Sequence, residues 1–181
     1  PGVAFLVEST TTHERHVVVT DATGHVDTSA AARPHTHRTN ANDAAWDAAT
    51  GTVDEAILDA DAGLWFYGNT EGTGEPNDTL GALPYDTYTF TELATTASQG
   101  TELVSFEVSI REDKAAVNLG TVEDVWIPVL TTQLLSRDGS QTAYALGDER
   151  LVDTGSYEHF KAGTYVAELE LCDEAGNVLQ D

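Results

Sequence analysis

The sequence contains one cysteine, Cys172, no methionine, and only 8 lysines and arginines against 31 aspartates and glutamates over 181 residues. A single cysteine cannot form a disulfide within the chain, so the class of disulfide-stapled scaffolds is excluded, although secretion itself is not. The shortage of basic residues gives a formal net charge of -23. Such a charge repels phosphate backbones and anionic lipid surfaces, so we expect neither nucleic acid nor a membrane surface as a partner.

Long apolar runs are missing as well. No run approaches the ~20 residues of a membrane span, and Pro1 leads directly into the apolar segment 2–7 without the basic region that opens a signal peptide. We therefore expect no membrane insertion by this segment. The absent initiator methionine suggests that the segment was excised from a longer protein.

The sequence is rich in short alternating segments. Hydrophobic residues make up 40% of the chain, enough for a core, and the segments 17–20, 88–91 and 103–110 alternate apolar and polar residues as half-buried strands do. In the last of these, Val104, Phe106, Val108 and Ile110 fall on one face because strand side chains alternate with period two. We expect that face to be core.

Further strands are expected at 126–135, 142–146 and 164–171, with Gly-containing turns between them. Many short strands with such turns indicate an all-β protein, and specifically immunoglobulin-like or prealbumin-like β-sandwich modules in tandem. A division near residue 124 gives a first domain, 1–124, and a second, 125–181. The second has too few strands for a complete sandwich, so we expect it to be cut short.

Residues 29–62 break the strand pattern. Asn40, Asn42 and Asp43 precede an Ala-rich stretch, which is a helix start signal, and residues 54–58 can form a second short turn. We expect a long, partly helical insert in the first domain. Long connections without strands are usually functional or disordered, so the insert should be the part of this domain that packing explains least.

Three stretches of the first domain resemble the SpaA-like, prealbumin-like domains of Gram-positive surface proteins and pilins. They are the Gly-x-x-Phe strand at 2–5, the Thr-Asp-x-x-Gly hairpin at 20–24, and the Leu-Pro-x-Gly-x-Tyr-x-x-x-Glu strand at 83–92, where Asp86 replaces the usual Gly. The resemblance covers most of 1–124 outside the insert. It implies that Glu92 is the acid that assists an isopeptide bond. The family's lysine strand would precede Pro1, and Lys114 and Lys161 lie in polar turns, so we expect no such bond within this chain.

The second domain resembles the beginning of a VaFE-repeat or Thr-Gln ester-bond domain of the same class of stalk. The similar stretches are an opening strand at 128–134, a Val-Asp-Thr run at 152–165 and a strand and turn at 168–179. In such domains a Thr hydroxyl attacks a Gln carboxamide with help from acidic groups and a histidine. The resemblance implies that Thr132 is the nucleophile and Asp153 the acid, with the His and Gln partners beyond Asp181. For both residues an ordinary role, in a strand or a turn, remains an equal alternative.

Other functional sites find little support in the sequence. His35 and His37 could ligate a metal, but no second tight pair of ligands follows, and the acidic stretch 40–61 lacks the EF-hand spacing. Trp65 and Tyr67 could line a sugar platform, although core packing is the simpler interpretation. Hydrolase, phosphate-loop and Rossmann signatures are absent. We therefore expect no enzyme, no cofactor and no metal.

The function predicted from these observations is a structural stalk segment of an extracellular adhesin or pilus-like protein. It would be anchored to the cell surface or cell wall through other regions, would contact the neighbouring domains of the same protein and would resist mechanical load. Two alternatives stay open. In one, the insert 29–62 binds a host glycan or protein. In the other, the few lysines and many aspartates indicate a haloarchaeal surface-layer or filament protein.

Overall fold

The computed structural model describes residues 2–113, 115, 117–118, 122, 125–136, 139, 151–168, 170, 172, 175 and 177–178. The chain divides into two compact units, which we call the first unit (Pro1–Ile127) and the second unit (Pro128–Asp181). Regular structure in the described residues is mostly antiparallel β, with three short 3-10 turns and no α-helix. The predicted all-β class is confirmed at this level.

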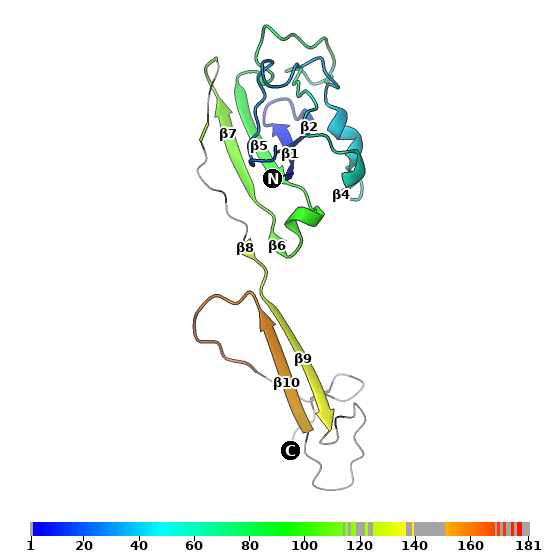
Figure 1. Cartoon of the computed structure of the whole chain (residues 1–181), viewed down its shortest axis with the longest axis vertical. Coiled ribbons are helices and arrows are strands. Elements are labelled where there is room, and N and C mark those ends of the chain that lie inside the picture. Colours follow the sequence, from blue (N-terminus) through cyan, green and yellow to red (C-terminus); the bar gives the residue numbers. More distant parts are fainter. Residues whose placement is uncertain are drawn as a thin grey trace. The chain divides into compact units, whose positions relative to one another are not determined.

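A four-stranded antiparallel sheet forms the centre of the first unit, with strand order β2-β1-β5-β7 (Figure 1). Its strands have the β-branched and aromatic composition that suits a pleated, half-buried surface. In chain order they are β1 (Ala4–Ser9), β2 (Arg15–Val19), β5 (Asp86–Glu92) and β7 (Ser105–Ile110).

Each face of this sheet carries its own apolar cluster. Residues that lie opposite one another on paired strands share a face, which assigns each residue to one of the two clusters. On one face, Phe5, Val7 and Val18 pack with Leu64, Phe66 and Tyr88. On the other face, Ala4, Val17, Val19 and Leu93 form a second cluster. Val108 is buried on the first face, with Phe106 and Ile110 half-buried beside it, so the expected core face of this strand is confirmed.

The insert 29–62 is packed on the sheet, contrary to expectation. Trp46, Val53, Leu58 and Ala60 lie against the second cluster. The partly helical character expected of the insert is not confirmed. Its local structure is a pair of 3-10 turns and a short strand pair: η1 (Ala41–Ala45), β3 (Trp46–Asp47), β4 (Thr52–Val53) and η2 (Glu55–Ile57).

The end of the first unit is formed by short elements. A 3-10 turn, η3 (Thr96–Ser98), leads into β6 (Thr101–Glu102), which pairs with β8 (Val125–Trp126). The expected strand 126–135 is therefore interrupted at Ile127 and Pro128. Pro128 supplies no backbone N–H, so it interrupts a hydrogen-bonded ladder.

A two-stranded hairpin of β9 (Val129–Ser136) and β10 (Leu151–Glu158) is the regular part of the second unit. Its described side chains are exposed or, at Leu135, half-buried. The strand predicted at 142–146 lies outside the described residues. The strand predicted at 164–171 is wrong for the described residues 164–168 and 170, which are not in strands.

Candidate functional site

Glu92 lies at the end of β5, opposite Phe5 of β1, and is only 2% exposed. It therefore shares the face of the first apolar cluster. Its Oε2 accepts a hydrogen bond from the backbone N–H of Val104 at 3.0 Å, and its own N–H donates to the Val104 carbonyl at 2.9 Å. Burying a carboxyl group costs free energy unless the group is hydrogen-bonded or paired. Glu92 is therefore a buried strand residue whose carboxylate is held by the backbone of Val104.

Neither of the two lysines of the chain is a described residue of the first unit, in which Glu92 lies. Lys114 lies outside the described residues, and Lys161 is exposed in the second unit. The amine partner that the SpaA-like resemblance implies is therefore not assigned to a residue of this chain.

The predicted ester-bond residues, Thr132 and Asp153, lie on one face of the β9–β10 hairpin. Thr132 is opposite Gly155, and Asp153 is opposite Leu134, so the two residues are diagonal neighbours. Diagonal neighbours in an antiparallel pair are about 7–8 Å apart, beyond direct hydrogen bonding but within reach of a group placed between them. Both are exposed. Whether they react stays a prediction.

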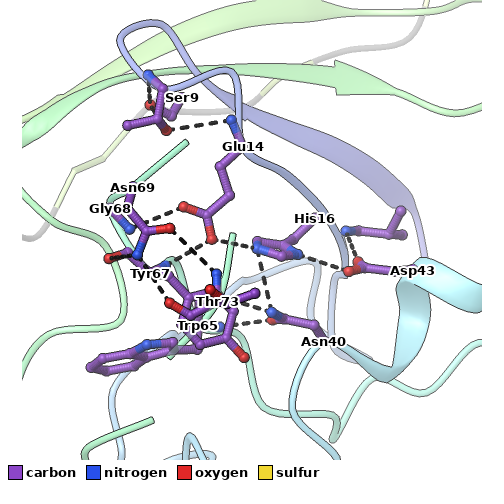
Figure 2. A network of polar contacts seen from close by, with 12 residues as sticks. Ser9, Glu14, His16, Asn40, Asp43, Trp65, Tyr67, Gly68, Asn69 and Thr73 are labelled. Atoms are coloured by element: carbon purple, nitrogen blue, oxygen red, sulfur yellow. Dashed lines mark hydrogen bonds and ion pairs between the residues drawn. The ribbon is translucent and has the colours of Figure 1, made fainter. Parts of the chain in front are cut away.

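A buried polar network that the sequence did not reveal lies at the β2 edge of the sheet (Figure 2). His16 of β2 is 8% exposed, and its Nε2 lies 2.9 Å from Oε1 of Glu14. Its Nδ1 lies 2.7 Å from Oδ2 of Asp43, a residue of η1. The histidine ring is thus held between two carboxylates, one from its own hairpin and one from the insert.

Backbone amides complete the network. Glu14 accepts hydrogen bonds from the N–H groups of Tyr67 at 2.7 Å and Gly68 at 3.0 Å. Asp43 accepts one from the N–H of Val17 at 2.8 Å through its other oxygen, Oδ1. Because β2 is an outer strand, Asp43 covers a backbone donor that would otherwise be open to pairing.

Asn40 connects the insert to Trp65 through its side chain. Its backbone has the left-handed conformation, with φ of 53°. Its Oδ1 accepts from the N–H of Trp65 at 2.9 Å, and its Nδ2 donates to the Trp65 carbonyl at 2.9 Å. Asparagine tolerates this conformation better than most residues. The sequence pattern predicts Asn40 as a helix start, but its side chain makes no capping hydrogen bond. It instead pairs with both backbone groups of Trp65, as the backbone of a neighbouring strand would.

The surroundings of His16 favour its charged form. Burial lowers the pKa of His16, but the hydrogen bonds and charges of Asp43 and Glu14 outweigh burial and raise the pKa above the usual 6.5. A neutral imidazole has one N–H, so it can donate to only one of two carboxylates. The protonated ring can donate to both carboxylates, and its Nε2 also lies 3.3 Å from Nδ2 of Asn40.

Asp86, which replaces the usual Gly of the SpaA-like pattern, has a structural role beside Ser9, the last residue of β1. Its carboxylate accepts hydrogen bonds from the hydroxyls of Ser9 at 2.5 Å and Thr11 at 2.8 Å. Partial burial raises the pKa of Asp86, but the hydrogen bonds from Ser9, Thr11 and the backbone outweigh it and leave the pKa below 3.8. Asp86 thereby ties the β1–β2 turn to the start of β5.

A cavity of about 110 Å³ lies beside Asp86. The carboxylates that line it, those of Glu14 and Asp86, already accept hydrogen bonds from backbone or hydroxyl donors. The cavity therefore has no group that points to a particular ligand. Its lining consists of Ser9, Thr11, Thr12, Glu14, Phe66, Gly68, Pro84, Tyr85, Asp86 and Tyr88.

The histidines considered as metal ligands are separated by the fold. His35 is 1% exposed, with Nε2 at 3.0 Å from the Thr28 carbonyl and its ring against Trp65, whereas His37 is exposed. Trp65 is buried in this contact, as core packing predicted. Across the described ranges there is no group of three or more His, Cys, Asp or Glu residues that could hold a metal ion.

Sequence reasoning missed the network at His16 for a physical reason. Glu14 and His16 are two residues apart and therefore share a strand face, which is a weak signal that the sequence does contain. Asp43 and Tyr67 are brought to them by the path of the insert. No periodicity in the sequence encodes that path.

Comparisons with models of protein families, with curated proteins and with solved structures found no match for this chain. Among the described residues, none of the helical segments has the length and hydrophobicity that a membrane crossing requires.

Proposed function

We propose that this chain is a structural stalk segment of an extracellular surface protein, and that the first unit resists tension. The observation that carries the proposal is the strand arrangement of the first unit. β1 and β7 are both antiparallel to β5, so they run in the same direction. Tension applied through the start of β1 and the end of β7 therefore acts at opposite ends of the sheet.

This arrangement places the sheet in shear. Ala4 lies at the end of the sheet where β5 finishes, and Ile110 is paired with Asp86 at the other end. Inter-strand hydrogen bonds in antiparallel ladders are perpendicular to the strands, so sliding one strand along another strains many bonds at once. Peeling a strand from its end breaks them one after another. A sheet loaded in shear therefore withstands more force than the same sheet when peeled.

The pair β6–β8 gives the first unit a weaker outer element. Ile127 donates to the Gly100 carbonyl at 2.9 Å, next to the Thr101–Trp126 pair. Tension entering at Ile127 peels this short pair from one end. We expect β8 to detach first, after which tension reaches Ile110 and the shear-loaded ladders.

The finer assignment, tandem prealbumin-like or immunoglobulin-like modules, is part of the same proposal. It is supported by the positions of the resembling stretches. The Gly-x-x-Phe stretch enters β1, and the stretch that ends at Glu92 forms β5 beside it. In this proposal Glu92 occupies the acid position of an isopeptide bond whose lysine is not in this chain, and Thr132 and Asp153 occupy ester-bond positions whose His and Gln partners are likewise not in this chain. Neighbouring domains of the same surface protein are the partners.

Force spectroscopy on the full chain, held at its two termini, tests the proposal. We expect low-force extensions from β8 and the second unit, followed by a higher-force rupture that releases the segment from β1 to β7, about 350 Å of chain when fully extended. A variant, Glu8→Pro, removes the backbone donor of a β1 residue that is paired with Thr89 of β5, and should lower the rupture force. Opening of the first unit at the same force as the hairpin would contradict the proposal.

The charge of -23 favours one variant of this function, a surface or filament protein of a haloarchaeon. Self-repulsion at such a charge destabilises a compact state unless salt screens it. Unfolding of the first unit at low ionic strength, followed by tryptophan fluorescence, would support that source. Full stability in low salt would dismiss it and leave the stalk function in place. Binding of a host molecule by the insert stays a prediction.

A further inference from the structure

The insert contacts the β2 edge at three places: at the His16 ring, at the backbone N–H of Val17, which donates to Asp43, and at Trp46, over whose ring the Arg15 guanidinium lies at 5.6 Å. The histidine is the contact whose charge changes with pH.

The ring nitrogens of His16 face Glu14 at 2.9 Å and Asp43 at 2.7 Å, and its ring packs edge-on against Phe66 at a centroid distance of 4.7 Å. Its Nε2 also lies 3.3 Å from Nδ2 of Asn40, and the ring of Tyr67, a further titratable group, has its centroid 6.5 Å away. The two carboxylates that contact the ring come from different parts of the chain.

The two carboxylates are not equally free to move. The Glu14 side chain is 3% exposed and is held by two backbone N–H groups of the segment that follows the insert. The Asp43 side chain is 38% exposed and can turn toward water. If the histidine lost its proton, the remaining N–H could serve only one carboxylate, and the solvent-accessible one would leave at lower cost.

We propose that protonated His16 fastens the insert to the β2 edge, and that loss of this proton as the pH rises releases Asp43 and loosens η1 from that edge. The device lies entirely within the first unit. Its consequence is that the backbone N–H of Val17 becomes available at high pH, because Asp43 Oδ1 is its acceptor in the closed arrangement.

The sign of the effect follows from the charge state. A histidine whose pKa is raised by folding stabilises the folded arrangement fully below the unfolded value of 6.5, and the stabilisation is lost as the pH rises through the higher folded value. The closed insert is thus favoured below the folded pKa of His16 and weakened above it. For each unit by which folding raises the histidine pKa, the closing equilibrium weakens about tenfold on the alkaline side.

Amide hydrogen exchange of the full chain between pH 6 and pH 9, expressed as protection factors, tests this device. Protection of the Val17 amide should fall over this range, by about tenfold for each unit by which folding raises the histidine pKa. Protection of Leu93, which donates to the Ala4 carbonyl at 2.9 Å within the sheet, should stay constant and so exclude general unfolding. Tyr67, held by the less mobile Glu14, should change less than Val17.

Three variants, one of them a control, separate the charge of His16 from its shape. His16→Gln keeps a hydrogen-bonding side chain without a titrating charge, and should give weak Val17 protection that does not vary with pH. His37→Gln, at an exposed histidine of the same insert, should retain the wild-type profile. Asp43→Asn keeps the Oδ1 acceptor for Val17 but removes the charge beside His16, so it should lower the titration midpoint of His16 measured by NMR. This measurement tests the proposal even if His16→Gln does not fold.

Equal Val17 protection at pH 6 and pH 9 in the wild-type chain would overturn the proposal. So would a His16 titration midpoint at or below 6.5. A midpoint above that value, together with selective loss of Val17 protection, would establish it.

Discussion

The central sheet and the β9–β10 hairpin are built from similar alternating sequences but differ in how they would meet tension. In the sheet, the start of β1 and the end of β7 lie at opposite ends, so pulling produces shear. In the hairpin, Val129 and Glu158 are paired at one end, so pulling on them peels the strands apart. Strand direction, and not strand number alone, therefore decides whether a β-element resists extension.

The two regions also differ in what covers them. Phe66 and Tyr88 are each 1% exposed in the first unit, whereas Leu130 and Tyr157 of the hairpin are 59% and 73% exposed. The insert and the segment around Phe66 supply the cover for the sheet. A strand with one apolar face contributes to a core only where another part of the chain lies on that face.

The largest contrast is expected from truncating one large side chain in each region. Phe66→Ala should destabilise the first unit by about 3–5 kcal/mol, because it leaves a cavity beside Tyr88 and His16. Leu130→Ala, at an exposed position of β9, should change the stability of the hairpin by less than about 0.5 kcal/mol. Chemical denaturation followed by tryptophan fluorescence measures the first effect, since all three tryptophans lie in the first unit, and amide hydrogen exchange of β9 and β10 measures the second. Equal effects would remove the distinction between the regions.

A smaller loss is expected when the insert is detached from the segment at Trp65. Asn40→Gly removes both side-chain hydrogen bonds to Trp65 without straining the left-handed backbone, and should cost about 1–3 kcal/mol in the free energy of unfolding. Asn40→Ala should cost about 1 kcal/mol more, because alanine is strained in that conformation. If both variants unfold like the wild type, the insert does not contribute to the stability of the sheet.

The smallest effect is expected at Asp86. Asp86→Asn should lower the stability of the first unit by about 1 kcal/mol at neutral pH, because it weakens hydrogen bonds from Ser9 and Thr11. The pKa of Asp86 lies below 3.8 in the folded chain, so its contribution is present above that pH and is lost as the pH falls further. Denaturation curves of the two proteins at pH 7 and pH 3 should therefore converge at the lower pH.

The sequence predicted the parts of the fold that depend on local periodicity. β7 and the apolar face of Val104 and Phe106 follow from alternation, as does the position of β5. Prediction failed where packing decided: residues 164–168 alternate without forming a strand, and the insert forms 3-10 turns and a strand pair on the sheet.

The candidate sites also divide into features that local sequence periodicity determines and features that long-range packing determines. The burial of Glu92 follows from strand register, which places Glu92 and Phe90 on the same covered face of the sheet. The network at His16 depends on Asp43 and Tyr67, which are far from it in sequence. Such contacts are set by the route of the chain and leave no periodic trace.

The most direct test of the account compares two directions of pulling on the same sheet. Single cysteines would be introduced as handles, with Cys172→Ser as background, in the pairs Gly2 with Asp113 and Thr11 with Asp113. The first pair loads the sheet from opposite ends and the second from the same end. We predict a clearly higher rupture force for the first pair. Equal forces in the two directions would contradict the claim that this unit is built to resist tension in shear.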